Sequence, residues 1–343
     1  MEEMTIKDIA KLCGVGVSTV SRAINNHPDI NPETKAMIMN AIEENGYIPN
    51  NSARNLKRTE AKSIAVLVKG MSNLFFSTMI KVMEEEIKKK KYTLVLHHVE
   101  FNEDEIDVAL QLVKEKRLAG IIFLGGYFLH KEKLEKLQVP YVLSTVSGPP
   151  DNLDWKDFSS IAVDDEAESF KMVDYLIKLG HKRIAILSAI SMDESIGKLR
   201  LLGYKRALQE NHIPLDESLI APMRTDMEQY SMSNGYMVTK QLLESNIKFT
   251  ALYAISDMLA IGACKAILES GKRIPEDYSV AGFDGIELGK YYNPSLTTIK
   301  QPVEEMARAT VKVLFKVLSD NAEHKHQVVP AELIKGESTR ELL

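Results

Sequence analysis

Three side chains close to the start of the chain have the chemistry needed to contact DNA bases. Val17, Ser18 and Arg22 follow a glycine-containing segment at residues 14–16. A valine methyl group can meet a thymine methyl group, a serine hydroxyl can donate or accept, and an arginine can bond guanine through two N–H groups. We therefore interpret these residues as candidates for reading base edges, which requires that one exposed helix face presents them together.

The apolar pattern around these residues predicts two short helices. The first helix has its apolar positions at Ile6, Ile9, Ala10 and Leu12, and the second at Val20, Ala23 and Ile24. Thr5, with Asp8 three residues later, forms a capping box at which the first helix begins. Two short helices around a glycine turn are typical of a helix-turn-helix, whose second helix enters the major groove by its N-terminal residues. The sequence therefore predicts that the protein binds DNA.

A third helix completes the predicted helical unit. Asn31 can cap it, Pro32 suits its first position, and Glu33 complements its positive dipole end. The helix is expected to end near residues 44–46. The apolar residues expected to close a small core with the first two helices are Ala36, Ile38, Met39, Ala41 and Ile42.

The segment that follows, residues 47–58, is basic and contains a proline. Asn50 can cap a helix of about two turns, which is too short to hold by itself in water. Ala53 beside Leu56, with Arg54 between them, suits an apolar wedge in the minor groove whose basic neighbours contact phosphates. An ordinary basic interdomain linker fits the composition equally well.

Composition limits the class of protein. The 343 residues exceed one ordinary domain, and 45% hydrophobic with 27% charged residues is typical of a folded globular chain. No apolar run is long enough to span a bilayer, and the N-terminus lacks the features of a signal peptide, so we expect a cytoplasmic protein without membrane contact. Cys13 and Cys264 are far apart and are expected to be core thiols rather than a disulfide or a metal site.

The charge of the helical unit is only slightly basic. Residues 5–58 hold seven basic and five acidic residues, while the whole chain has a net charge of −5. This small excess of basic over acidic residues attracts the DNA phosphates only weakly and predicts modest non-specific affinity for DNA. A dimer would double the contacts.

From residue 62 onward, buried strands alternate with amphipathic helices. The expected strands are 63–68, 93–96, 120–124, 140–143, 161–163, 184–187, 251–254 and 279–282. The expected helices are 76–90, 103–115, 166–179, 199–210, 234–244 and 257–269. This alternation predicts doubly wound parallel sheets in two successive α/β lobes, with a ligand in a cleft where the strand C-termini of both lobes meet.

Several motifs resemble the lactose/galactose repressor family of bacterial transcription regulators. In the helical unit they are Thr5–Ala10, Gly14-Val15, Ser18–Arg22, Tyr47–Asn50 and Ala53-Arg54. In the core they are Gly180–Ala185, Arg200–Tyr204, Ser256-Asp257, Pro275–Asp277, Gly282–Asp284 and Leu296–Ile299. The motifs occur in the family's order and span essentially the whole chain.

This resemblance implies a small all-α helix-turn-helix head and an α/β core of two lobes like that of periplasmic sugar-binding proteins. The implied boundaries are residues 1–49 for the head, 50–61 for a hinge helix and 62–343 for the core. Three crossovers join the lobes, with about 62–160 and 292–320 in lobe 1 and about 161–291 and 321–343 in lobe 2. The family's DNA contacts fall on Val17, Ser18, Thr19, Arg22, Asn50, Ala53, Arg54 and Leu56.

The resemblance also implies an effector site in the core. Arg200 and Asp284 match positions that hold polar effector groups, and Phe75, Phe76 and Tyr230 match aromatic positions that lie against a ring. Ser256 and Asp257 stand at a further contact position, although Asp257 fits a helix cap equally well. Two positions depart from the family pattern, since Ser144-Thr145 replaces an Asp-containing pair and Ser256 replaces an Asn.

The implied function is that of a repressor that binds a near-palindromic operator in double-stranded DNA as a homodimer, or as a tetramer. A small polar metabolite, such as a sugar or sugar derivative, would control it, and no cofactor is expected. The alternatives are control mainly by a protein co-repressor, or a solute-binding protein with a vestigial DNA-binding head. No set of nucleophile, base and orienting residue is evident, so we do not expect an enzyme.

Overall fold

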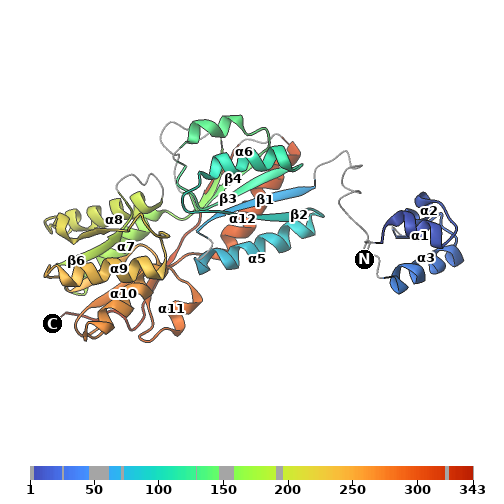
Figure 1. Cartoon of the computed structure of the whole chain (residues 1–343). Helices are drawn as coiled ribbons and strands as arrows, with labels where there is room; N and C mark the ends of the chain where they lie inside the picture. The colour runs from blue at the N-terminus through green and yellow to red at the C-terminus, as the bar shows by residue number, and fades with distance from the viewer. Residues whose placement is uncertain are drawn as a thin grey trace. The chain divides into compact units, whose positions relative to one another are not determined.

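The computed structural model of the chain describes residues 4–24, 27–45, 62–70, 73–128, 130–146, 158–190, 196–320 and 324–342. The chain divides into two compact units, residues 1–60 and 61–343. Figure 1 shows helices alone in the first unit and two sheets with their helices in the second.

The first unit holds the three predicted helices, α1 (Ile6–Leu12), α2 (Val17–Ile24) and α3 (Pro32–Glu44). The capping box forms at the start of α1, where Thr5 N and Oγ1 donate to Asp8 Oδ2 at 2.9 and 2.5 Å. Asn31 caps α3, because its Oδ1 accepts from Glu33 N at 2.8 Å. Gly14, with φ +62°, allows the sharp turn between α1 and α2.

The core of this unit is narrower than the sequence predicts. Its buried side chains are Ile9, Ala10, Val20, Ala23 and Ile38. Leu12, Ala36 and Met39, which the sequence analysis assigns to apolar faces, are exposed. The physical reason is size: a three-helix unit this short can bury only a narrow stripe of each helix.

The second unit contains two six-stranded sheets, one in each lobe. The sheet of lobe 1 has the strand order β11-β5-β4-β3-β1-β2, and the described pairings are all parallel. Its strands are β1 (Ser63–Lys69), β2 (Thr93–Val99), β3 (Gly120–Leu124), β4 (Tyr141–Ser144), β5 (Ser159–Ala162) and β11 (His326–Val328).

The sheet of lobe 2 has the order β12-β10-β9-β8-β6-β7. Its strands are β6 (Ile184–Ser188), β7 (Ile220–Pro222), β8 (Ala251–Ala254), β9 (Ser279–Asp284), β10 (Thr297–Lys300) and β12 (Glu332–Ile334). The edge strand β12 runs antiparallel to β10, so the prediction of wholly parallel sheets needs this correction. An antiparallel edge is compatible with a doubly wound sheet.

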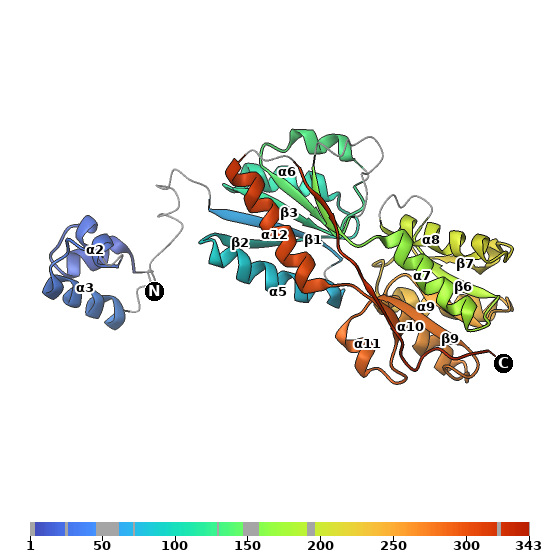
Figure 2. The ribbon, with the colours of Figure 1, turned by 180° about the vertical axis from the view of Figure 1, so that it is seen from behind.

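Helices cover both faces of the lobe 1 sheet. Helices α5 (Leu74–Lys89) and α12 (Val303–Asp320) pack side by side on one face, as Figure 2 shows. Helix α6 (Glu105–Glu115) and the 3-10 helix η1 (Lys131–Lys136) lie on the other. Alternate residues of β1 therefore enter separate apolar clusters: Val66 faces α5, and Leu67 faces α6.

Lobe 2 is built in the same way. Helix α7 (Asp165–Lys178) packs on α8 (Ile196–Glu210), and α9 (Met232–Glu244) packs on α10 (Asp257–Glu269). The sheet lies between these two helix pairs (Figure 1). The shorter elements are the 3-10 helix η3 (Glu217–Leu219) and the helix α11 (Glu287–Tyr291).

Three crossovers join the lobes, as the resemblance implies, but the expected lobe boundaries are wrong near the C-terminus and by a few residues near 160, since β5 pairs with β4 in lobe 1. The crossovers fall between β5 and α7, between β10 and α12, and between β11 and β12. Strand β10 belongs to lobe 2 because it pairs with β9, and β11 belongs to lobe 1 because it pairs with β5. The chain therefore returns to lobe 1 only after residue 300.

In the part of the chain that the structure describes, no helix is both long enough and apolar enough to cross a membrane. The two cysteines are unpaired: Cys264 is buried and Cys13 is half-buried. Burial raises the pKa of Cys264 to about 12, so it is a core thiol as predicted.

Candidate functional site

The outer face of α2 presents the residues expected to meet DNA. Val20 and Ala23 are buried against α1 and α3, which turns Val17, Ser18 and Arg22 outward. Thr19 is half-buried. The expected contact residues Asn50, Ala53, Arg54 and Leu56 lie outside the described residues.

A cavity of about 330 Å³ lies between the two lobes of the second unit. Lobe 1 lines it with Lys69, Gly70, Asn73, Phe75, Phe76, His98, Glu100, Phe101, Gly125, Gly126, Tyr127 and Thr145. Lobe 2 and the segment after β10 line it with Ile196, Arg200, Glu228, Gln229, Tyr230, Asp284 and Gln301. Most of these residues lie at or just after the carboxyl end of a strand, so the cavity lies where the carboxyl ends of parallel strands predict a ligand site.

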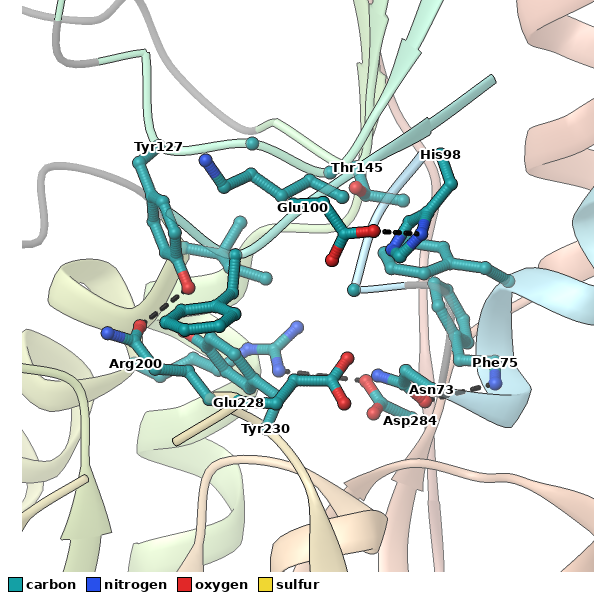
Figure 3. A pocket seen from close by; sticks show the side chains of 18 of the residues that line it. Asn73, Phe75, His98, Glu100, Tyr127, Thr145, Arg200, Glu228, Tyr230 and Asp284 are labelled. Atoms are coloured by element: carbon teal, nitrogen blue, oxygen red, sulfur yellow. Dashed lines mark hydrogen bonds and ion pairs between the residues drawn. The ribbon is translucent and has the colours of Figure 1, made fainter. Parts of the chain in front are cut away.

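Arg200 and Asp284 form the polar floor of this cavity (Figure 3). Arg200 is 2% exposed, and its Nε and Nη2 both lie 2.8 Å from Asp165 Oδ1. Its Nη1 donates to Ile255 O at 2.5 Å and lies 3.6 Å from Asp284 Oδ1. Although burial opposes the charge, Asp165 and Asp284 hold the pKa of Arg200 above its ordinary value, so the guanidinium stays charged.

The Asp284 side chain is incompletely paired. Its Oδ1 accepts from Gln301 Nε2 at 2.9 Å, whereas its buried Oδ2 has no hydrogen-bond partner. Burial raises the pKa of Asp284 to about 6, despite the opposing effects of Arg200, Gln301 and the nearby Asn73 amide. An unsatisfied buried acceptor costs about 1–3 kcal/mol, which a ligand hydroxyl could recover.

A second unpaired polar atom lines the same cavity. Thr145 follows β4 with φ +68°, and its buried Oγ1 has no partner. A threonine in the left-handed region is unusual, because the branched side chain makes that conformation strained. The strained backbone and the two unpaired oxygens, Thr145 Oγ1 and Asp284 Oδ2, indicate a site shaped for a ligand that can donate hydrogen bonds.

A side-chain hydrogen bond links the lobes beside the cavity. Tyr127, which follows β3 in lobe 1, donates from its hydroxyl to Gln229 Oε1 of lobe 2 at 2.5 Å. Lys69 Nζ lies 4.9 Å from the centre of the Tyr127 ring and 3.1 Å from Glu105 Oε2. Glu105 also accepts from Phe128 N. The loop that carries Tyr127 is thus fixed by a buried ion pair.

Comparisons with known proteins decide the family. Residues 5–50 match the model described as "Bacterial regulatory proteins, lacI family", and residues 173–339 match the "Periplasmic binding protein-like domain". The chain is 41% identical over 338 residues to the HTH-type transcriptional regulator MalR of Clostridium butyricum, covering 98% of this chain and 99% of MalR. The chain belongs to the lacI family of bacterial regulatory proteins.

Solved structures of this family agree with the fold. The lac repressor dimer bound to operator and the anti-inducer ONPF superposes with a TM-score of 0.74 at 27% identity, covering 99% of this chain and 100% of that one. The transcriptional regulator CelR in complex with cellobiose gives a TM-score of 0.72 at 25% identity, covering 98% and 100%. This lacI-family protein is therefore a DNA-binding transcription regulator and not an enzyme.

The structure brings most of the expected effector residues of this lacI-family regulator together. Arg200, Asp284, Phe75, Phe76 and Tyr230 all line the cavity. The rings of Phe75 and Phe76 have centroids 5.5 Å apart at 60°. They provide an apolar wall opposite the polar floor.

Two expected contact residues of the lacI-family regulator do not line the cavity. Ser256 caps α10, where its Oγ accepts from Leu259 N at 3.2 Å. The buried Asp257 accepts from Thr298 Oγ1 at 2.6 Å and from Ile286 N at 2.8 Å, so both carboxylate oxygens are occupied within the protein. Burial, followed by the charge of Asp284, raises the pKa of Asp257 well above its ordinary value. The structure therefore corrects this expectation: Asp257 holds the loop after Asp284 in place.

Several lining residues of the lacI-family regulator were missed by the sequence analysis. His98, Tyr127 and Gln301 each lie at or just after the end of a strand, and that rule of position could have found them. Nothing in the sequence indicates that Lys69 and Glu228 line the cavity, because a single charged residue usually lies on the surface. Among the described residues, no group of His, Cys, Asp and Glu could hold a metal ion.

Proposed function

We propose that this regulator is a repressor that binds a near-palindromic operator as a homodimer and responds to a small polar metabolite, a sugar or sugar derivative, in the cleft between its lobes. The observation that carries this proposal is the unpaired Oδ2 of Asp284, buried in a cavity that both lobes line. The complex of the related CelR with cellobiose supports the sugar class.

Dimer formation is supported by the solved structure of a related regulator. The related lac repressor binds its operator as a dimer. Two copies of α2 related by a two-fold axis would read two half-sites of a palindrome.

Effector control would act through the angle between the lobes. A ligand in the cavity would contact both lobes: Arg200 and Asp284 in lobe 2, and Phe75 and Thr145 in lobe 1. It would stabilise the lobe angle to which it binds most tightly, by the difference in its affinity for the two angles. The lobe angle in turn sets the spacing of the two DNA-binding units of the dimer. Such a regulator acts where the chromosome lies, in the cytoplasm.

Footprinting of the full-length protein on the promoter regions beside its own gene tests this function. We expect a protected region with two inverted half-sites, and a change in protection when a sugar that stabilises the protein is added. Protection without any inverted repeat would contradict binding to a near-palindromic operator as a homodimer. A response only to a protein from cell extract would favour the co-repressor alternative.

A further inference from the structure

The two cationic side chains that line the cavity are already neutralised from outside it. Among the described lining residues the only Lys and Arg are Lys69 and Arg200. Lys69 Nζ pairs with Glu105 at 3.1 Å, in a pair whose side chains are 8% and 3% exposed. Arg200 pairs with Asp165 at 2.8 Å, and neither Glu105 nor Asp165 lines the cavity. A ligand anion would therefore find no uncompensated positive charge.

Acidic groups outnumber basic ones on the cavity wall. Glu100, Glu228 and Asp284 line it together with the two neutralised cations, and Figure 3 shows these three carboxylates around the cavity. His98 Nδ1 lies 3.4 Å from Glu100 Oε1. A cleft lined mainly by one sign of charge raises the local concentration of the opposite sign and repels its own. A phosphate or carboxylate ligand is disfavoured here before any contact is made.

The two unpaired oxygens also favour an uncharged ligand over an anion. Asp284 Oδ2, when ionised, can only accept a hydrogen bond, and Thr145 Oγ1 can donate or accept. A sugar hydroxyl can donate to Asp284 and still accept from a neighbour. A doubly ionised phosphate has no proton to donate to Asp284, so it would leave this oxygen unpaired and add a like charge beside it.

The apolar wall fits a ring that has no charge on its face. Phe75, Phe76 and Phe101 line the lobe 1 side, and Tyr230 lines the lobe 2 side. The C–H faces of a pyranose can lie against such rings while the hydroxyls at its edge reach Arg200 and Asp284. This division into apolar faces and a polar edge is the chemistry of a neutral carbohydrate.

We propose that the cleft selects an uncharged sugar and rejects phosphorylated sugars and other anions, because Glu105 withdraws the charge of Lys69 from the cavity. This inference rests on the proposed function and narrows its effector class. Lys69 and Glu105 are 36 positions apart in the chain, so only the fold brings them together. Glu105 acts through Lys69 and the Phe128 amide, and is therefore a positioning residue.

Matched ligands that differ only in charge test the selection. Thermal unfolding of the full-length protein would be followed with glucose, glucose 6-phosphate and glucosamine, and with maltose or cellobiose beside their phosphate esters. We expect stabilisation by neutral sugars of the panel and none by the phosphate esters, whereas the acidic wall can tolerate the cationic glucosamine. A phosphate ester that stabilises the protein more than its matched neutral sugar would overturn the proposal.

Variants test the role of the Lys69–Glu105 pair with inorganic phosphate as the probe, so that no effector needs to be known. Wild-type protein should unfold at the same temperature in phosphate as in chloride of matched ionic strength. Glu105→Gln should gain stability in phosphate and bind glucose 6-phosphate about tenfold more tightly than wild type does, a change of about 1.4 kcal/mol. The double variant Lys69→Met/Glu105→Gln should lose that gain.

Glu100→Lys gives a second route, because the Glu100 side chain is 61% exposed and its replacement does not disturb the core. It should also gain phosphate binding. Failure of both Glu105→Gln and Glu100→Lys to gain phosphate binding would overturn the proposal. Operator binding measured on the same preparations distinguishes the proposed function from the proposed ligand preference. If wild-type protein does not bind an operator, the proposed function is contradicted, but the preference for uncharged sugars is not.

Discussion

The hydroxyl of Tyr127 in lobe 1 donates a 2.5 Å hydrogen bond to Oε1 of Gln229 in lobe 2. Both residues line the cavity, so a contact between the lobes lies beside the ligand site. The bond exists only when the lobes are at this angle, and it therefore adds to the stability of this angle whether or not a ligand is present.

Tyr127→Phe should weaken sugar binding about three- to tenfold, because a net hydrogen bond is worth about 0.5–1.5 kcal/mol and the ring keeps its contact with Lys69. Titration calorimetry with the sugar that most stabilises the wild-type protein measures the effect. Gln229→Met should have a similar effect, and the double variant should add little to either. Fully additive losses would show that the two residues act separately.

Sugar affinity should rise with pH through about 6. The folded pKa of Asp284 is raised to about 6, mainly by burial, and its ionised Oδ2 is the acceptor for a ligand hydroxyl. Binding to the ionised form lowers this pKa and releases a proton, so affinity must increase as pH rises. The folding stability of the unliganded protein should change in the opposite direction. Because the Asp284 pKa is higher in the folded than in the unfolded state, the free energy of unfolding should fall as pH rises from about 3.9, the unfolded value, to about 6.

Calorimetric titrations between pH 5 and pH 8 measure this dependence, and Asp284→Asn is the matched control. The variant should bind the sugar weakly and with no change of affinity near pH 6. A wild-type affinity that is flat across this range would show that Asp284 Oδ2 does not accept from the ligand.

Arg22→Ala should relax base preference at one base pair in each half-site, at a cost of about 1–3 kcal/mol for the preferred base. Arg22 is exposed on the outer face of α2, where a bidentate contact with guanine is sterically open. Fluorescence anisotropy with operators altered one base pair at a time gives the measurement. Lys35→Ala on α3 serves as the charge control and should weaken all operators slightly. A uniform loss for Arg22→Ala would reduce its role to phosphate contact.

Asn31→Ala should destabilise the helical unit by about 1 kcal/mol, because the Asn31 side chain accepts from both Glu33 N and Thr34 N at the start of α3. Hydrogen exchange of the full-length protein should show faster exchange in α3. Asn40→Ala, an exposed position within the same helix, should leave exchange unchanged or slow it. Equal acceleration in both variants would argue against the cap.

The sequence predicted the fold well where a local pattern determined it. Continuous apolar runs such as Gly120–Leu124 became buried strands, and the caps at Thr5 and Asn31 formed. The short strands β10 and β11 were assigned to the wrong lobes or missed, because four and three residues of mixed polarity do not indicate which sheet they join. Only tertiary pairing decides that.

The residues of the cleft were also predictable only in part. Arg200 and Asp284 came from the family resemblance, and strand ends indicated the region of the cavity. The Lys69–Glu105 pair could not be predicted, because each residue taken alone resembles an ordinary surface charge and their burial depends on the packing of β1 against α6. The residue type of Asp257 fits a helix cap and a ligand contact equally well, and the structure shows neither: Ser256 caps α10, while Asp257 accepts from Thr298 Oγ1 and Ile286 N.

Control of DNA binding by the cleft is tested most directly by the operator affinity of wild-type protein and Asp284→Ala, each measured by anisotropy with and without the sugar that stabilises the wild type. We expect equal operator affinity without sugar, a clear sugar response in the wild type and none in the variant. A variant that keeps the response at the same sugar concentration would contradict the claim that this cleft controls DNA binding.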